Sequence, residues 1–358
     1  MKLPTAKNIH IDSYSSGLSR IVNSTNLIKL SQNETPLGPC SDVSKIIKKS
    51  LINVSRYPDG NSSLLREKLS KKFKLNKDQI IIGCGSDEII SLVCQAFLDK
   101  DDEVILSENS FLMYRIYAQI NGAKVIFSKE KDNTFDIEET IKSITNRTKI
   151  IFIANPNNPT GTYLGKEDIL KLRSLIPSHI LLMIDDAYAE FMISKDFRSG
   201  LDLFKDFKNV IVCRTFSKIY GIANLRLGWG YSSKETVKSL NLIRPPFNIS
   251  GVTQEAGIAS LGNQKWLNKN IKHNTKWSKI FYKKLSEKKF KINKPCANFF
   301  LMNCDNLKLN SDDIFNIFLK YNILLRKMTS YRIKNSLRVS IGNDKENKKF
   351  LKVLESKI

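Results

Sequence analysis

The regular alternation of short apolar strand patterns with longer helical patterns constrains the fold of this chain more than any other feature of its sequence. Seven runs rich in β-branched residues predict strands: Ile80–Ile82, Glu103–Leu106, Lys124–Phe127, Ile150–Ile153, Ile180–Ile184, Val210–Cys213 and Leu225–Gly230. Helical spacing occurs between many of them: Asp87–Phe97, Phe111–Asn121, Ile137–Ile144 and Glu167–Leu175. Apolar strands joined by crossover helices are typical of a mostly parallel sheet covered on both faces. We therefore expect an α/β fold with a mostly parallel, seven-stranded sheet flanked by helices, and ligands at the carboxyl ends of its strands.

The domain organisation follows from length and from a change of pattern near residue 250. A chain of 358 residues exceeds what one hydrophobic core usually serves. Beyond residue 250, long lysine-rich helical patterns lead to three strand patterns and a final helix: Gln254–Leu261, Gln264–Lys289, Asn298–Met302, Ile323–Arg326 and Ser336–Ile341. We predict an N-terminal arm over 1–32, a large domain over 33–250 and a smaller α+β domain over 251–358. An arm of this kind usually needs a partner surface to become ordered.

Composition argues against several classes of protein. The apolar stretches are far shorter than the ~20 residues that span a bilayer, so we expect no membrane segment, and the start of the chain lacks the apolar region of a secretory signal. The six cysteines have no CxxC spacing and the three histidines are far apart in sequence. We therefore expect no metal site and no disulfide framework, and a reducing, cytoplasmic setting.

The net charge of +23 would ordinarily suggest a polyanionic partner. The excess is mostly lysine spread over amphipathic helical patterns, and no compact basic stripe with interleaved aromatic residues is present. We expect a solvated surface and no nucleic-acid partner.

Two glycine-containing segments follow predicted strands. Gly83-Cys84-Gly85-Ser86-Asp87-Glu88 opens a helix, so that free N–H groups could hold a phosphate, although a Gly-rich turn with an N-cap explains the same residues. In Asn155-Pro156-Asn157-Asn158-Pro159-Thr160-Gly161, two X-Pro units and a terminal glycine predict a rigid turn, and such a turn would explain these residue types even if the segment had no function. Asn158 is nevertheless well suited to present a fixed amide at a strand end.

Two charged positions also follow strands. Asp185 ends an apolar run, where a buried carboxylate would need a cation, with Tyr188 beside the same spot; the alternative is an N-cap for the next helix. Lys218 lies among hydroxyl side chains in Arg214-Thr215-Phe216-Ser217-Lys218, as expected of an amine nucleophile. Arg226 offers a planar, bidentate donor for a phosphate.

In this order, these motifs resemble the class I/II aminotransferases of fold-type I, which depend on pyridoxal phosphate (PLP), over nearly the whole chain. Within that superfamily the chain is most similar to the histidinol-phosphate aminotransferase family. The segments that carry this similarity are Ser31–Pro39, Arg56–Gly60, Gly85–Glu88, Ile323–Arg326 and Asn335–Gly342, with Tyr14-Ser15-Ser16-Gly17 in the arm. The chain departs from the family pattern at four positions: Thr35, Leu37, Asn224 and Asp186.

The resemblance implies roles for the cofactor-binding residues. Lys218 would bind PLP covalently and then move the substrate proton, and Asp185 would pair with the protonated ring nitrogen. Tyr188 and Asn158 would donate to the ring oxygen, and Phe111 would stack on the ring. The phosphate would be held by Gly85, Ser86, Asp87, Thr215, Ser217 and Arg226, with Tyr57 reaching it from the neighbouring subunit of a homodimer.

It also implies roles toward the substrates. Arg338 would bind the α-carboxylate of glutamate, and Arg326 with Tyr14 from the partner's arm would hold the phosphate of histidinol phosphate. Asn33 would lie close to the reacting group. The implied activity is transamination between glutamate and imidazole-acetol phosphate in histidine biosynthesis.

Three alternatives stay open at this point. A threonine- or serine-phosphate decarboxylase and an aromatic amino-acid aminotransferase would share the cofactor residues and differ in the lining of the pocket. A PLP-binding regulatory protein would need an attached DNA-binding module, and the residues before Asn33 are too few and too poorly periodic for a helix-turn-helix.

Overall fold

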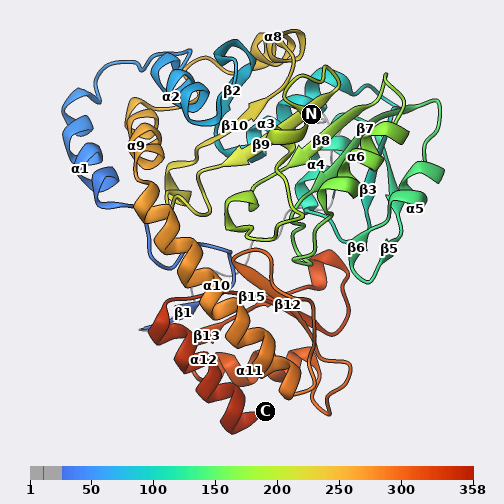
Figure 1. Cartoon of the computed structure of the whole chain (residues 1–358). Helices are drawn as coiled ribbons and strands as arrows, with labels where there is room; N and C mark the ends of the chain where they lie inside the picture. Colours follow the sequence, from blue (N-terminus) through green and yellow to red (C-terminus); the bar gives the residue numbers. More distant parts are fainter. Residues whose placement is uncertain (1–10, 12–25) are drawn as a thin grey trace, which may run out of the picture.

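The computed structural model describes residue 11 and residues 26–358, in which a seven-stranded sheet forms the centre of the larger part of the molecule (Figure 1). In spatial order its strands are β2 (Ile80–Gly83), β10 (Gly228–Tyr231), β9 (Val210–Thr215), β8 (Leu181–Asp185), β7 (Thr148–Ala154), β3 (Glu103–Ser107) and β4 (Lys124–Ser128). β10 runs antiparallel to both of its neighbours, and all other pairs are parallel. The predicted mostly parallel sheet and each of its seven strands are confirmed.

Both faces of this sheet are buried, as its continuous apolar strands require. Ile150 and Phe152 of β7 belong to one buried apolar cluster, whereas Ile151 and Ile153 belong to another, because successive side chains point to opposite faces. One face is covered by α3 (Gly85–Phe97), α4 (Leu112–Ile120) and α8 (Lys234–Ile243). The other is covered by α2 (Ser63–Phe73), α6 (Lys166–Leu175), α7 (Gly200–Phe204) and α9 (Gly251–Gly262).

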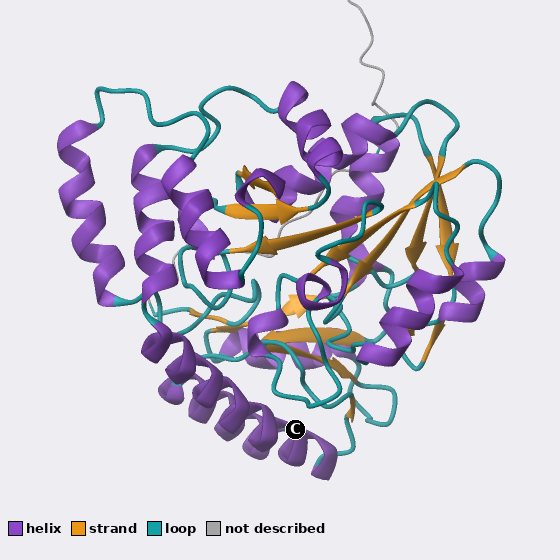
Figure 2. Ribbon diagram, turned by 45° about the horizontal axis from the view of Figure 1, so that its top comes forward, coloured by secondary structure: helices purple, strands orange, loops and turns teal. Residues whose placement is uncertain are grey.

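A second, smaller unit lies below the sheet in Figure 1 and has a core of its own. Its four-stranded sheet has the order β11 (Lys291–Ile292), β12 (Phe299–Asn303), β15 (Ser336–Ser340) and β14 (Arg326–Lys327), with all neighbours antiparallel. The helices α10 (Gln264–Glu287), α11 (Ser311–Lys320) and α12 (Asp344–Lys357) pack on it. In the view of Figure 2, coloured by secondary structure, these helices lie outside the smaller sheet.

The packing bears on where the two units meet. α1 (Ser41–Ser50) packs against α9, so α9 belongs to the larger core although it follows residue 250. β1 (Ile28–Lys29) pairs in parallel with β13 (Ile323–Leu324), so the end of the predicted arm is part of the smaller unit. α10 contributes Leu267 to the larger core and Phe281 to the smaller one. The division into 1–32, 33–250 and 251–358 stays a prediction. By this packing, the first boundary would fall before β1 and the second boundary would fall after α9.

Two short strands, β5 (Glu130–Lys131) and β6 (Thr134–Phe135), form a hairpin between β4 and α5 (Ile137–Lys142). Of the helices in the described part of the chain, none is both apolar enough and long enough for a membrane span.

Candidate active site

The carboxyl ends of β7, β8 and β9 open onto a cavity of about 330 Å³, which is where a parallel sheet presents its ligands. Most of the residues that the sequence predicts for the cofactor line this cavity: Ser86, Asp87, Phe111, Asn158, Asp185, Tyr188, Thr215, Ser217, Lys218 and Arg226. Gly85 lies at the start of α3 directly before two of them. The structure therefore brings together side chains from five separate segments of the sequence.

At one end of the cavity the backbone forms a narrow turn that only glycine can occupy. Gly85 has φ +82°, and a Cβ there would lie 2.6 Å from Nη2 of Arg226. A Cβ on Gly228 would lie 2.2 Å from the backbone of Gly85 and Ser86. The absence of both side chains lets the N-terminus of α3 and the Arg226 guanidinium face the same space, which suits an anion.

Hydroxyl groups complete this anion cradle. Arg226 Nη1 donates to Ser217 Oγ at 3.2 Å, and the backbone N–H of Ser217 donates to Thr215 Oγ1 at 3.1 Å. Asp87 accepts a hydrogen bond from Tyr117 at 2.8 Å, while its other oxygen is buried without a partner among the described residues. Burial raises the pKa of Asp87. The cradle therefore combines one guanidinium, two hydroxyls and the free N–H groups of a helix start.

The carboxylate of Asp185 lies at the end of β8 and is 7% exposed. It accepts hydrogen bonds from Tyr114 Oη at 2.7 Å and from the backbone N–H of Ala187 at 3.0 Å. Burial raises its pKa, against the effect of these two donors. A buried carboxylate with polar donors but no direct ion pair among the described residues is suited to meet a cationic group in the cavity.

Lys218 projects from the segment that follows β9, and its amine lies 5.5 Å from the centre of the Tyr188 ring. Removal from water, with Arg338 nearby as the next largest cause, lowers the pKa of Lys218 to about 8. At pH 7 about a tenth of an amine with such a pKa is deprotonated, which is far more than for an ordinary lysine. It can therefore act as a nucleophile or a base without a partner that removes its proton.

Tyr188 and Asn158 connect the cofactor side of the cavity with the substrate side. Tyr188 Oη accepts from Asn33 Nδ2 at 3.0 Å, and burial raises the pKa of Tyr188 to about 12, so it keeps its proton. Asn158 Oδ1 accepts from Arg338 Nη1 at 2.5 Å. Asn33, which directly follows the predicted arm, and Arg338 from the smaller unit thus contact residues at the strand ends of the larger unit.

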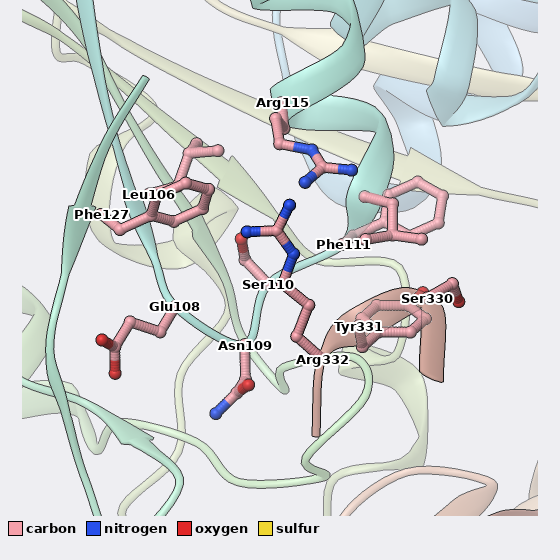
Figure 3. A pocket seen from close by; sticks show the side chains of 11 residues that line it. Leu106, Glu108, Asn109, Ser110, Phe111, Arg115, Phe127, Ser330, Tyr331 and Arg332 are labelled. Carbon is pink, nitrogen blue, oxygen red and sulfur yellow. The ribbon is translucent and has the colours of Figure 1, made fainter. Parts of the chain in front are cut away.

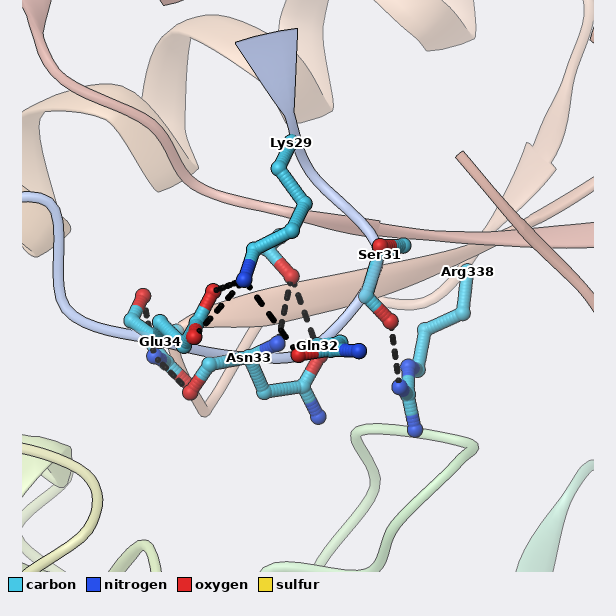
Figure 4. Close-up of polar contacts among 8 residues, drawn as sticks. Lys29, Ser31, Gln32, Asn33, Glu34 and Arg338 are labelled. Atoms are coloured by element: carbon cyan, nitrogen blue, oxygen red, sulfur yellow. Dashed lines mark hydrogen bonds and ion pairs between the residues drawn. The ribbon is translucent and has the colours of Figure 1, made fainter. Parts of the chain in front are cut away.

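An adjoining cavity of about 430 Å³ holds the predicted substrate residues Asn33, Arg326 and Arg338, and it shares Lys218 with the first cavity. Arg338 also donates to the backbone oxygen of Ser31 at 3.0 Å, as Figure 4 shows. Both arginines are about nine-tenths buried or more. Arg326 and Arg338 lie opposite each other on the paired strands β14 and β15, so this cavity contains two buried guanidiniums that can bind anions.

Asn33 is held through its own backbone by side chains of the smaller unit. Its N–H donates to Ser340 Oγ at 2.7 Å, its backbone oxygen accepts from Asn298 Nδ2 at 2.9 Å, and it adopts φ +55°. An asparagine tolerates this left-handed conformation better than most residues. In Figure 4 the neighbouring Lys29 forms an ion pair with Glu34 at 2.8 Å, which fixes the same stretch from outside.

Sequence reasoning missed three residues around the site. Tyr114, which holds Asp185, lies three positions after Phe111 on α4, and this i, i+3 spacing was the available signal. Arg115 and Arg332 line a further cavity of about 360 Å³ next to Phe111, and their guanidinium groups point toward one another in Figure 3. No pattern in the sequence relates these two arginines, because they come from the two different units.

One predicted residue, Tyr57, lies apart from this constellation. Tyr57 is 83% exposed and stacks on Phe247 at 4.7 Å, and it lines neither cavity. Tyr14 lies outside the described residues. Both are predicted to act on a neighbouring subunit.

The positions that depart from the family pattern lie in different surroundings. Asn224 lines the substrate cavity, whereas Thr35 donates to Asn270 at 2.7 Å behind it. Asp186 points to the opposite side of β8 from Asp185 and accepts from Ser199 and from the N–H of Gly200. Burial raises the pKa of Asp186 to about 7. None of these residues changes the anion cradle.

The donor set fits pyridoxal phosphate. The cradle offers a phosphate a positive charge and hydrogen-bond donors. The buried Asp185 carboxylate can pair with a protonated ring nitrogen, and the Lys218 amine can react with an aldehyde. Phe111, at the N-cap of α4, lies at the cavity wall where a flat ring would stack. Among the described residues, no group of three or more His, Cys, Asp or Glu side chains could hold a metal ion.

The fold and this constellation define a fold-type I transferase. The sequence profile of the family "Aminotransferase class I and II" matches residues 25–354, and the chain belongs to this family. It is 48% identical to the histidinol-phosphate aminotransferase of Pelagibacter ubique, with 99% of each chain covered. It is 38% identical to the enzyme of that name from Caldicellulosiruptor saccharolyticus, with 92% of this chain and 91% of the relative covered.

The fold is shared with solved structures. The crystal structure of histidinol-phosphate aminotransferase from Sinorhizobium meliloti in complex with pyridoxal-5'-phosphate has a TM-score of 0.85 at 21% identity. The match covers 92% of this chain and 91% of that one. At this identity the likeness establishes the fold.

Proposed function

We propose that this chain uses pyridoxal phosphate to transfer an amino group between glutamate and imidazole-acetol phosphate, giving 2-oxoglutarate and histidinol phosphate. The observation that carries the proposal is a lysine with a lowered pKa in a cleft that also holds two separate buried arginines, Arg338 and Arg326. Transamination needs one amine and a binding site for each substrate's anion. The names of the relatives that cover nearly the whole chain support the same substrates.

Pyridoxal phosphate, when bound, supplies an aldehyde that takes up the amino group and a pyridine ring that withdraws electrons from the substrate carbon. Lys218 would hold the aldehyde carbon covalently until the amino substrate displaces it. Its freed amine, with a pKa near 8, would then accept the proton from the substrate α-carbon and donate it to the former aldehyde carbon of the cofactor.

Asp185 would keep the ring nitrogen protonated, because a buried carboxylate without an ion pair gains most from a facing cation. Tyr114 and the N–H of Ala187 would hold this carboxylate in place. Tyr188 and Asn158 would donate to the ring oxygen, and Phe111 would cover one face of the ring.

The glycine turn would hold the cofactor phosphate. Gly85, Ser86 and Asp87 would present the N-terminus of α3, and Thr215, Ser217 and Arg226 would supply hydroxyl and guanidinium donors. The cation and the helix start together would neutralise most of the phosphate charge.

The substrate anions would bind at the two buried arginines. Arg338, already fixed by Asn158 and Ser31, would bind the α-carboxylate of glutamate. Arg326 would bind the phosphate of histidinol phosphate with Tyr14 of the partner's arm. Asn33, which donates to Tyr188, would lie beside the reacting group.

We further propose a homodimer in which Tyr57 and the N-terminal arm reach the neighbouring active site. Tyr57 is one of several exposed apolar side chains between residues 51 and 64; the others are Leu51, Ile52, Val54 and Leu64, which are 56–81% exposed. Exposed apolar side chains of this kind are typical of a protein interface. A cytoplasmic setting fits a biosynthetic enzyme of this kind, with no nucleic-acid or membrane partner.

The test is an assay of the purified, PLP-loaded protein with a panel of amino donors: histidinol phosphate, phosphothreonine, phosphoserine, phenylalanine and tyrosine. 2-Oxoglutarate is the acceptor, and glutamate formation and carbon dioxide release are measured in parallel. We expect glutamate with a kcat/KM at least about tenfold higher for histidinol phosphate than for the other donors, and no carbon dioxide. Release of carbon dioxide from phosphothreonine or phosphoserine would replace the proposal by a decarboxylase, and a preference for phenylalanine by an aromatic transaminase.

A further inference from the structure

A further cavity of about 590 Å³ lies between the two units, away from the catalytic cleft. It is lined by the β6 hairpin, the segments that follow β7 and β8, one face of α10, and the segment 293–296. None of its lining residues belongs to the cavities that hold Lys218, Arg326 or Arg338. Its volume is in the range of small-molecule sites, which are preferentially found between structural units.

Two polar side chains that line this cavity each have a buried oxygen without a hydrogen-bond partner among the described residues. Asn274 and Ser278 are 6% and 7% exposed, and they lie one turn apart on the same face of α10. Asn274 Nδ2 donates to the backbone oxygen of Ala297 at 3.1 Å, which leaves Asn274 Oδ1 without a donor, and Ser278 Oγ likewise has no partner among the described residues. Buried polar atoms are normally satisfied, so a pair of them in one cavity points to a group that binds there.

The rest of the lining includes apolar and cationic side chains. Phe191, Met192, Tyr282 and Pro295 provide the apolar surface. Two exposed lysines, Lys279 and Lys294, line the cavity as well, and neither forms an ion pair with a described carboxylate. No aspartate or glutamate lines the cavity.

We propose that this interdomain cavity binds a small aromatic or heteroaromatic carboxylate that carries an O–H or N–H group on its ring. The ring would pack on Phe191 and Tyr282, and its donor would satisfy Asn274 Oδ1 while Ser278 donates to the same group or accepts from it. The carboxylate would lie between Lys279 and Lys294. This site goes beyond the proposed transamination and does not depend on it.

The test uses the PLP-loaded protein with ¹³C-methyl-labelled methionine and 4-hydroxyphenylacetate as the probe. Met192 lines the interdomain cavity and Met113 lines the catalytic cavity, so their methyl signals report separately on the two sites. Each signal is assigned by a Met→Leu variant. We expect a saturable shift of the Met192 signal at probe concentrations that leave the Met113 signal unmoved.

Two related probes test the polar contacts. Phenylacetate lacks the ring O–H, and 2-(4-hydroxyphenyl)ethanol lacks the carboxylate. We expect each to bind about tenfold more weakly at Met192. Phenylacetate cannot donate to Asn274 Oδ1, and 2-(4-hydroxyphenyl)ethanol has no carboxylate for Lys279 and Lys294. Equal affinity for all three compounds would contradict the proposal, as would a Met113 shift with the same concentration dependence or no Met192 shift at millimolar probe.

Replacements of the lining residues test whether the interdomain cavity is the binding site. Lys279→Gln combined with Lys294→Gln, and separately Ser278→Ala, should each weaken the binding of 4-hydroxyphenylacetate about tenfold. The matched control is Lys272→Gln with Lys283→Gln, which removes the same charge from exposed positions of α10 outside the cavity. Because the lysines are exposed, their replacement does not threaten folding. An unchanged affinity in the cavity variants, or an equal loss in the control, would overturn the proposal.

Discussion

The two ends of the catalytic cleft are built in different ways. At the cofactor end, the functional side chains belong to short motifs at the ends of adjacent strands, as with Asp185 after β8 and Lys218 after β9. At the substrate end, Asn33, Arg326 and Arg338 come from the stretch before α1 and from the smaller unit. The first end is placed by one parallel sheet, whereas the second depends on how two units pack together.

This difference separates two kinds of function. The cofactor end would serve every substrate, because the same amine and carboxylate act in both halves of the reaction. The substrate end would distinguish one substrate from another through its separate arginines. Replacements at the cofactor end should therefore affect both half-reactions equally, and replacements at the substrate end should not.

The largest effect is expected for Lys218→Ala. Loss of the amine should abolish transamination with every substrate, by about 10⁴-fold or more, and should remove the covalent link to PLP. The measurements are single-turnover rates for both half-reactions and mass spectrometry after reduction with borohydride. A borohydride-stable adduct in the variant would reject the assignment.

A somewhat smaller effect is expected for Asp185→Asn. The amide keeps the shape but cannot stabilise a proton on the ring nitrogen, so kcat should fall about 10³-fold for glutamate and for histidinol phosphate alike. Stopped-flow rates with each substrate alone test this result. A near-normal rate with either substrate would refute the proposed role.

Arg326→Gln should discriminate between the substrates. We expect kcat/KM to fall about 100-fold for histidinol phosphate and less than about threefold for glutamate, since only the former carries a phosphate. Arg338→Gln provides the reciprocal control, with the larger loss on glutamate. Equal losses on both substrates in both variants would remove the distinction between the two ends.

The lowered pKa of Lys218 predicts a pH-dependent stability in the cofactor-free protein. Unfolded lysine has a pKa of 10.5, and the folded value is about 8. Between these values the unfolded chain binds a proton that the folded protein does not, so the wild type loses stability as the pH falls from about 10.5 to 8. Relative to Lys218→Met, this loss should reach at most about 3 kcal/mol.

Urea unfolding of both proteins between pH 7 and pH 10.5 measures this difference. The Met variant should gain on the wild type as the pH falls toward 8, and the gap should stay constant below that. A gap that is independent of pH would show that the folded lysine titrates at its ordinary value.

The smallest effect is expected for Tyr114→Phe, which removes one donor to Asp185. Loss of one hydrogen bond to a charged group corresponds to about a tenfold decrease in kcat at saturating PLP. Tyr117→Phe is the matched control, because Tyr117 lies on the same helix and donates to Asp87 instead. An equal decrease in both variants would indicate a general effect on α4.

The sequence predicted the large sheet and the cofactor end because both depend on local patterns. A strand such as β8 is read from its apolar run, and Asp185 is placed by the end of that run. The antiparallel direction of β10 was not predicted, because apolar runs carry no information about direction. α11 was also missed, although its capping box at Asn310 and Asp313 is a local signal.

The residues of the substrate end could be assigned only through a family resemblance, since no local sequence pattern relates Asn33 to Tyr188 or Ser31 to Arg338. Arg115, Arg332 and the contact of Tyr114 with Asp185 were missed for the same physical reason. Their neighbours are set by tertiary packing, and a hydrogen bond between residues 71 positions apart leaves no trace in periodicity.

The helix α10 extends through 24 residues and contributes side chains to both hydrophobic cores. At 1.5 Å per residue it is a rod of about 36 Å. A rod anchored at each end does not allow the two units to swing freely, so any opening of the cleft has to proceed as a rotation about this rod or as a bend within it. A change in the stiffness of α10 should therefore alter how the cleft opens, so two glycine replacements at its exposed positions should change the rate of product release more than the rate of the chemical step.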